Sequence, residues 1–130
     1  MNGGGLAPLD AKLLALLGTG GVNNLGLPKR EIFLLDIVVA GTTHCDEISD
    51  VAPTLSEGTL LRMVRKPKNE YDAHAIAIYH HDTRIGWVPQ ELNLIISRLM
   101  DAGKEFYAKV SSTKLIHDWW RIKADIFMVE

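Results

Sequence analysis

The spacing of apolar residues along the chain predicts a mainly β domain. An apolar run rich in β-branched residues, at 32–40, predicts a strand that is either buried on both of its faces or enters a closed barrel. Alternating apolar and polar residues then predict further strands, two of them joined by a tight turn at His81 and Asp82. These further strands are expected at residues 59–63, 73–79, 84–88, 106–110 and 120–128.

One helix is expected between Pro89 and Gly103. Proline suits the first helical position, Glu91 favours the positive end of the helix, and the glycine supplies the stop. Five or six antiparallel strands with one crossing helix predict a small, partly open β-barrel of the OB-like or SH3-like type. The apolar residues of the helix form one stripe that is expected to face the core, namely Leu92, Ile95, Ile96, Leu99 and Met100.

The first 30 residues differ from the rest and predict a flexible segment with a short helix. Three glycines at 3–5 precede an apolar, helix-like pattern at 6–17 that a further glycine ends. The glycine-rich stretch at 18–21 lacks the lysine and the preceding strand of a phosphate-binding loop, so it is interpreted as a linker. We therefore expect an N-terminal helical extension, residues 1–30, followed by one barrel domain, residues 31–130.

Composition and charge narrow the choice of function. The chain has 130 residues, 47% hydrophobic and 23% charged, as expected for one globular domain. Its net charge of −2 excludes a nucleic-acid binder that relies on overall positive charge, so such binding would need a local basic patch. Residues 1–60 hold three basic and seven acidic residues (−4), whereas residues 61–130 hold eleven and nine (+2). The densest basic run either follows a phosphate chain or is simply a solvated turn; it contains Arg62, Arg65, Lys66 and Lys68.

Candidate catalytic and metal-binding residues lack the spacing that such chemistry needs. His80 and His81 are adjacent, so in a strand they point to opposite faces, and the polar cluster at 44–47 has no metal-ligand spacing. The single cysteine, Cys45, excludes an intramolecular disulfide and carries no local signature of a nucleophile. We expect no enzyme activity, no metal and no cofactor.

Targeting signals are also missing from the pattern. No apolar run approaches the roughly eighteen residues that cross a bilayer, and the start of the chain does not resemble a signal peptide. These features predict a cytoplasmic protein with no membrane contact.

The most informative segment joins the basic turn to an aromatic residue and an acid. Tyr71 presents a flat ring beside Lys66 and Lys68, and Asp72 adds a carboxylate acceptor. Rings next to cations hold single strands, because bases stack on the rings while the cations follow the phosphates. The alternative is structural: Tyr71 packs on the barrel, and Asp72 caps its own turn through backbone amides.

This segment resembles the motif of HIRAN domains, which occur at the front of helicase-like DNA-repair ATPases and as stand-alone bacterial proteins. The resemblance covers roughly residues 31–128 and continues through the Ile85-Gly86-Trp87-Val88-Pro89 run into the helix that ends at Gly103. The matching positions of the core motif are Arg65, Pro67, Asn69, Tyr71, Asp72, Ala75, Ile76 and Ile78.

The resemblance implies an OB-like barrel that holds the 3′ end of single-stranded DNA in DNA repair or processing, with a repair ATPase or nuclease as a partner. It implies that Tyr71 stacks on the terminal base and that Asp72 accepts a hydrogen bond from the free 3′-hydroxyl. A carboxylate attracts a hydroxyl donor and repels a 3′-phosphate, so this pair can discriminate a free end. The implied DNA-binding residues are Tyr71, Asp72, Asn69, Arg65, Lys66, Lys68, His44 and Trp87.

Some positions depart from the pattern of the DNA-binding members. Neighbouring tyrosines after the first strand are replaced by a segment in which His44 is the one ring available for stacking. Glu70 stands where a proline is usual, Trp87 replaces a polar ring, and Gln90 replaces a cation. A protein-interaction or purely structural module that keeps the fold without DNA binding is therefore the competing hypothesis.

Overall fold

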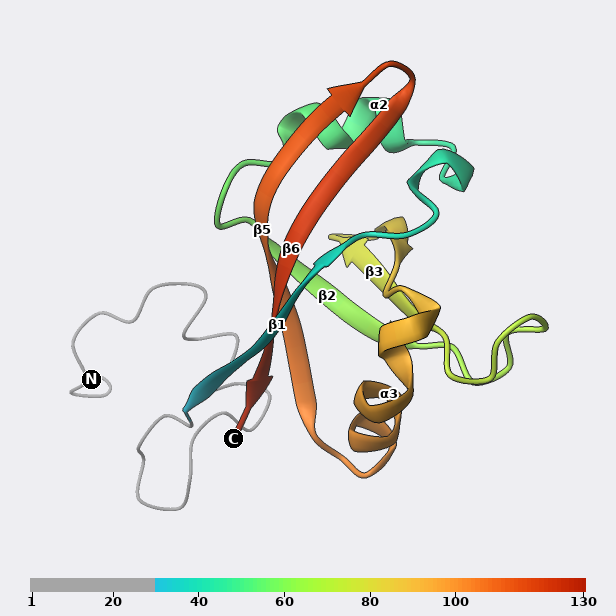
Figure 1. Cartoon of the computed structure of the whole chain (residues 1–130), viewed down its shortest axis with the longest axis vertical. Coiled ribbons are helices and arrows are strands. Elements are labelled where there is room, and N and C mark those ends of the chain that lie inside the picture. Colours follow the sequence, from blue (N-terminus) through green and yellow to red (C-terminus); the bar gives the residue numbers. More distant parts are fainter. Residues whose placement is uncertain (1–29) are drawn as a thin grey trace.

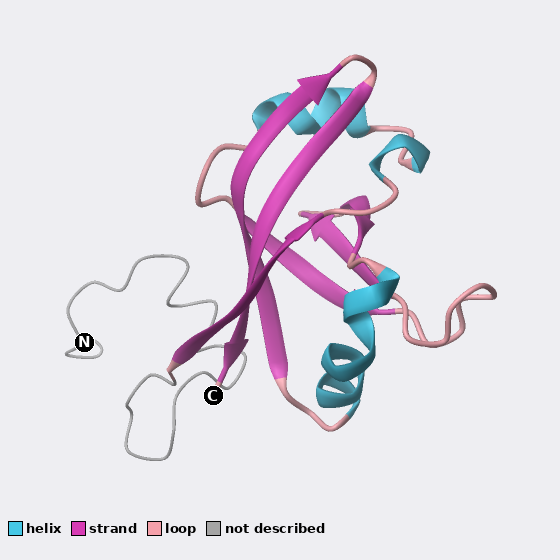
Figure 2. Ribbon diagram, viewed as in Figure 1, coloured by secondary structure: helices cyan, strands magenta, loops and turns pink. Residues whose placement is uncertain are grey.

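The computed structural model describes residues 30–130, which form one antiparallel sheet of six strands with a helix beside it (Figures 1 and 2). The flexible segment and short helix expected before residue 30 lie outside the described residues. Across the sheet the strands follow the order β1-β6-β5-β2-β3-β4. Their bounds are β1 Glu31–Val38, β2 Leu60–Arg65, β3 Ile76–His80, β4 Thr83–Trp87, β5 Glu105–Ile116 and β6 Trp119–Val129.

The sheet curls toward a barrel but does not close. Its edge strands, β1 and β4, are linked through a single bridge in which Ala40 and Trp87 exchange two backbone hydrogen bonds of 2.8 Å. Gly86 permits this approach, because a Cβ at that position would lie 2.4 Å from Val39 Cγ1 and 2.5 Å from the Ala40 carbonyl oxygen. The partly open OB-like barrel expected from the sequence is confirmed.

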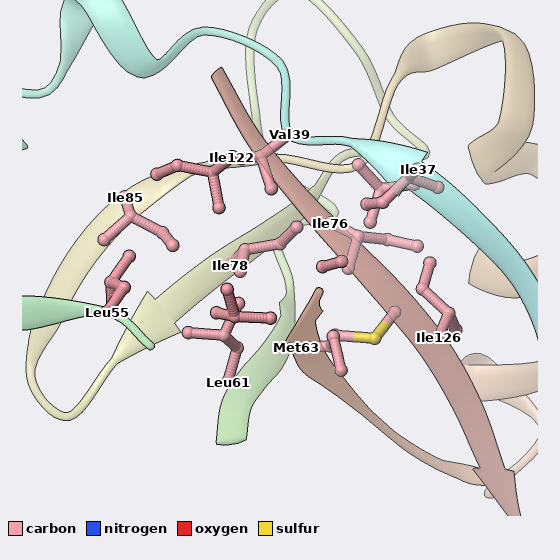
Figure 3. Close-up of a cluster of buried hydrophobic side chains, with 14 of the residues drawn as sticks. Ile37, Val39, Leu55, Leu61, Met63, Ile76, Ile78, Ile85, Ile122 and Ile126 are labelled. Carbon is pink, nitrogen blue, oxygen red and sulfur yellow. The ribbon is translucent and has the colours of Figure 1, made fainter. Parts of the chain in front are cut away.

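The core lies inside this curl and is built from alternate residues of the strands (Figure 3). Because successive side chains of a strand point to opposite faces, the residues between the core positions lie on the outer face of the sheet. Fully or almost fully buried core side chains include Ile37, Val39, Leu61, Met63, Ile76, Ile78, Ile85, Ile122 and Ile126.

Of the two alternatives for the first strand, burial on both faces is wrong. Ile37 of β1 and Val39 just beyond it enter the core, whereas Phe33, Leu34 and Val38 are exposed. The physical reason is the position of β1 at the edge of the sheet, where it pairs with β6 alone within the described residues. A β-bulge between Phe33 and Leu35 also interrupts the alternation of this strand.

The segment between β1 and β2 contains short helical turns. They are η1 (Thr42–His44), α2 (Ile48–Val51) and η2 (Ala52–Thr54). Ile48 of α2 and Ala52 of η2, with Cys45 and Leu55 beside them, join the core, and these turns cover the end of the barrel beneath the β5–β6 hairpin (Figure 1).

The expected helix is present as α3 (Asn93–Asp101), preceded by a 3-10 turn, η3 (Gln90–Leu92). Its buried face differs from the expected apolar stripe, because Ile95 is 62% exposed and Leu92 is also exposed. Ile96 is buried, but the polar residues Asn93 and Ser97 share that face with it. The helix is rotated because these two polar side chains bind groups of the loop between β2 and β3.

Candidate nucleic-acid interface

Residues 66–75 form the loop between β2 and β3, called here the end loop, and its backbone is fixed by its own hydrogen bonds. The amide of Lys66 donates to the Ala75 carbonyl at 2.9 Å, which closes the base of the loop. At the tip, the side-chain oxygen of Asn69 accepts from the amides of Tyr71 and Asp72 at 2.9 and 3.0 Å. Asn69 therefore steadies the loop.

Tyr71 projects from this fixed backbone into solvent. Its side chain is 84% exposed, the largest exposure among the large hydrophobic residues described. Because its amide is held by Asn69 while the ring is free, Tyr71 offers both faces of a ring to a ligand at little cost in backbone order. The structural alternative, in which the ring packs on the barrel, is not what the structure has.

Asp72 is held on both of its carboxylate oxygens. Oδ1 accepts from the amide of His74 at 2.8 Å, and Oδ2 accepts from Nδ2 of Asn93 at 2.8 Å. These bonds, that of Asn93 foremost, lower the pKa of Asp72 below its ordinary value, so it is charged at neutral pH. Asp72 thus caps its own turn, yet a carboxylate has about four lone-pair sites, and the half-buried side chain retains two for a further donor.

Arg65 anchors the end loop to the end of α3. Its guanidinium donates to both carboxylate oxygens of Asp101, at 2.8 and 3.1 Å, and to the carbonyls of Ala75 and Ala73, at 2.8 and 3.0 Å. Four of its five N–H groups are therefore used within the protein, and the side chain is only 13% exposed. This geometry gives Arg65 a structural role within the protein, in place of the contact with a DNA phosphate that was expected from the sequence.

The two lysines of the end loop remain available. Lys68 is exposed, and Lys66 Nζ lies 5.5 Å from the centre of the Tyr79 ring. Among residues 30–130 neither lysine forms an ion pair. The exposed carboxylate of Glu70 lies between them and Tyr71 in the sequence and offsets part of their charge.

Trp87 and His44 belong to a second cluster around the bridge that links β1 to β4. Trp87 packs on the left-handed Gly41, whose added Cβ would lie 3.1 Å from Trp87 Cδ1, and Arg84 lies 5.0 Å from the Trp87 ring centre. His44 is exposed in η1, three residues beyond Gly41. The structure thus brings Trp87 next to the segment that carries His44, while Tyr71, Asp72 and Asn69 gather in the end loop.

Sequence reasoning missed the polar residues of α3 that position the end loop. Asn93 donates to Asp72, and the hydroxyl of Ser97 lies 3.3 Å from Nδ1 of His74. Both α3 residues are buried although they are polar, which marks them as hydrogen-bonding partners. Their only signal in the sequence was the placement of polar residues among the apolar positions of the helix.

A groove of about 670 Å³ runs between β1 and the segment that leads into α3. Its walls carry the exposed apolar side chains of Val38, Leu92 and Trp119, together with the carboxylates of Asp36 and Glu91. None of the residues expected to bind DNA lines this groove. Its two carboxylates disfavour a phosphate chain.

Two further features are absent from the described part of the chain. Residues 30–130 contain no group of three or more His, Cys, Asp or Glu side chains arranged to hold a metal ion. No helix of this region is long and apolar enough to cross a bilayer.

Comparisons with known proteins give one family match and two solved structures with a similar fold. The family model of the HIRAN domain matches residues 32–128, whereas no curated protein gives a significant match. The crystal structure of a protein from Lactobacillus plantarum aligns with a TM-score of 0.72 and 22% identity over 78% of this chain and 98% of that chain. The crystal structure of the HIRAN domain of human HLTF aligns with a TM-score of 0.60 and 16% identity over 77% and 80% of the two chains. At such identities the two structures show a shared fold.

Proposed function

The chain belongs to the HIRAN domain family, which is a family of DNA-binding rather than catalytic domains, and from that premise we propose that it recognises the 3′-hydroxyl end of single-stranded DNA. In this proposal it acts in the cytoplasm as a recruitment module in DNA repair or processing and brings a repair ATPase or nuclease to the free end. The observation that carries the proposal is Tyr71, a ring that is 84% exposed on a loop with a fixed backbone.

In this proposal Tyr71 and Asp72 recognise different parts of the strand end. The terminal base stacks on Tyr71, a contact that is worth about 1–3 kcal/mol per base. Asp72 follows Tyr71 directly, and its two remaining lone-pair sites accept the 3′-hydroxyl. Because the pKa of Asp72 is lowered, the group stays charged at neutral pH and repels a 3′-phosphate. Lys66 and Lys68 then contact the phosphates that precede the end.

The end-blocking experiment compares two trinucleotides that differ in a single group. We expect the strand with a free 3′-hydroxyl to bind more tightly than its 3′-phosphorylated form, as measured by isothermal titration calorimetry. Asp72→Asn keeps the size of the side chain and removes its charge, so the preference for the free end should shrink. Equal affinity of the wild type for both strands would refute end recognition.

A ring-removal experiment tests stacking separately. Tyr71→Ala should weaken binding of the free-end trinucleotide by about 1–3 kcal/mol, whereas Tyr71→Phe should retain most of it, because the ring remains. Neither change should lower the free energy of unfolding by more than about 0.5 kcal/mol, since the side chain is exposed. Unchanged affinity of a folded Tyr71→Ala variant would remove the ring from the proposal.

The groove favours a second candidate function, a protein-interaction module. Val38, Leu92 and Trp119 are exposed apolar residues that line it, and Asp36 and Glu91 add negative charge. A basic, partly apolar peptide fits this chemistry better than DNA does. If this is the function, Glu91→Lys should abolish peptide binding while Tyr71→Ala leaves it unchanged. For trinucleotide binding the DNA proposal expects the reverse: Tyr71→Ala weakens it, and Glu91→Lys leaves it unchanged.

A further inference from the structure

A row of aromatic and basic side chains crosses the outer face of the sheet. The residues are cross-strand partners in register, so each lies beside the next on the same face. Phe33 of β1 is paired with Phe127 of β6, which is paired with Tyr107 of β5. Tyr107 is paired with Arg62 of β2, Arg62 with Tyr79 of β3, and Tyr79 with Arg84 of β4. This set, called here the outer row, is Phe33, Phe127, Tyr107, Arg62, Tyr79 and Arg84.

Three neighbouring rings of the outer row, on β1, β6 and β5, are in contact, and all its rings are partly open to solvent. The Tyr107 and Phe127 rings stack with their centres 5.3 Å apart, and Phe33 meets Phe127 edge-on at 5.8 Å. Phe33 is 54% exposed, and the other rings are half-buried. A large aromatic residue exposed on a sheet next to further rings is an unusual use of surface, and sheet-borne rings of this kind stack bases in nucleic-acid-binding domains.

The basic half of the outer row has cations that no acid neutralises. Arg62 and Lys66 lie 5.1 and 5.5 Å from the centre of the Tyr79 ring, and Arg84 lies 5.0 Å from that of Trp87. Within the described part of the chain none of these three cations forms an ion pair. Two unpaired cations at the Tyr79 ring and a third at the Trp87 ring suit the phosphates of a single strand.

In the other half of the outer row, acidic residues lie close to the rings. Lys109 lies 4.9 Å from the Phe127 ring centre, but its Nζ is 4.0 Å from a carboxylate oxygen of Glu31. By register, Glu105 and Asp125 also lie on the outer face near the Tyr107–Phe127 pair. The β1-β6-β5 half therefore offers rings without a surplus of positive charge, and the β2-β3-β4 half offers the positive charge.

We propose that the outer row is a second contact surface for single-stranded DNA, with phosphates on Arg62, Arg84 and Lys66 and bases against Phe33 and its neighbouring rings. The strands are about 4.8 Å apart, so the row spans about 24 Å, which suits the smallest sites of OB-folds, about four nucleotides. This surface needs no strand end, and so goes beyond recognition by Tyr71 and Asp72. Lys66 begins the end loop and joins the two surfaces.

Two ligands separate the outer row from the end site. A closed circular single strand has no 3′ end and reports on the outer row, whereas the trinucleotide with a free 3′-hydroxyl reports on Tyr71 and Asp72. We expect the wild-type chain to bind the circle, measured by fluorescence anisotropy. The double variant Arg62→Glu/Arg84→Glu should weaken that binding at least about tenfold and lower its salt slope by about 1.4, for two lost phosphates. Binding of the trinucleotide should not change.

The control is Arg98→Glu/Lys104→Glu, which changes the net charge equally through exposed residues on and just after α3. A loss of circle binding as large as that of Arg62→Glu/Arg84→Glu would overturn the proposal, because overall charge alone would then explain the binding. Failure of the wild type to bind the circle would also overturn it. Circle binding that persists when both trinucleotides bind equally would support the outer row and refute end recognition.

Stacking on the outer row is tested through its most exposed ring. Phe33→Ser should lower affinity for the circle at least about fivefold and leave trinucleotide binding unchanged. The change removes an exposed side chain at the sheet edge, so the fold should persist, which circular dichroism checks. If a folded Phe33→Ser variant binds the circle as the wild type does, the rings are not part of the surface.

Discussion

At the scale of single residues, the position of Asp72 depends on a partner 21 residues away. Asn93 is buried and uses its amide to hold Oδ2 of Asp72, so the carboxylate is aimed by the helix as well as by its own turn. A hydrogen bond to a charged group contributes about 1.5–3 kcal/mol. The position of the Asp72 carboxylate in the end loop is therefore set partly by α3, which lies outside the loop.

The Asn93–Asp72 bond predicts a pH-dependent stability. The pKa of Asp72 is lowered in the folded state, first by the Asn93 bond and then by the His74 amide. A lowered pKa stabilises the fold above the ordinary pKa of about 3.8 and loses this effect as the pH falls through the folded value. Asn93→Ala should therefore destabilise the chain by about 1–2 kcal/mol at pH 7, and by clearly less at pH 3.

Urea unfolding of the two proteins at both pH values provides the measurement, and Asn93→Asp is a useful comparison. That variant places two carboxylates together, so its cost at pH 7 should exceed that of Asn93→Ala and should decrease most on acidification. A cost that is the same at pH 7 and pH 3 for both variants would contradict the assigned bond.

At the scale of elements, the end loop is stabilised by its attachment to the helix beside it. Arg65 binds two carbonyls of the loop and the carboxylate of Asp101 at the end of α3. These bonds tie the loop to the helix and so fix the base of the segment that carries Tyr71 and Asp72 relative to α3.

Arg65→Lys tests this attachment, because lysine keeps the charge and loses the planar set of donors. We expect a loss of about 1–3 kcal/mol in the free energy of unfolding and faster hydrogen exchange at the amides of Asn69 and Ala75. Arg62→Lys, on the neighbouring outer face, serves as the control and should leave both amides protected. Unchanged exchange in Arg65→Lys would show that the loop holds itself.

The strands could be predicted from the sequence because their alternation is local, but the contacts of the candidate site could not. Ile76 and Ile78 reveal an inward face within a few residues. The Arg65–Asp101 pair, by contrast, joins residues 36 apart, and no local pattern pairs them. The same contacts explain the wrong stripe on α3, since burial of Asn93 leaves Ile95 exposed. The exposure of Tyr71 also needed the fold, because the sequence left open whether its ring stacks on a base or packs on the barrel.

At the scale of the whole molecule, one bridge decides how far the barrel closes. Ala40 and Trp87 link the two edge strands at the single point where Gly86 lets the backbones meet. Elsewhere the two edge strands are not paired, and the groove between β1 and the entry to α3 lies along this opening.

Gly86→Ala should therefore be costly, since the added Cβ would overlap both Val39 and the Ala40 carbonyl. We expect the free energy of unfolding to fall by at least about 3 kcal/mol, measured by thermal unfolding, with the contact between the two edge strands lost first. Gly58→Ala is the matched comparison: its Cβ meets nothing within 4 Å, so only the strain of φ +90° remains, about 1–2 kcal/mol. If the two variants lose the same stability, the close approach at Gly86 is not a constraint.

The bulge in β1 affects how readily the protein associates with other chains at high concentration. An edge strand with exposed Phe33 and Leu34 is a template on which another chain could add as a neighbouring strand and start a fibre-like stack. The extra residue at the bulge breaks the regular ladder there, and Asp36 adds a charge two residues after the bulge. The irregularity of this strand thus protects the protein against self-association while leaving its aromatic surface open.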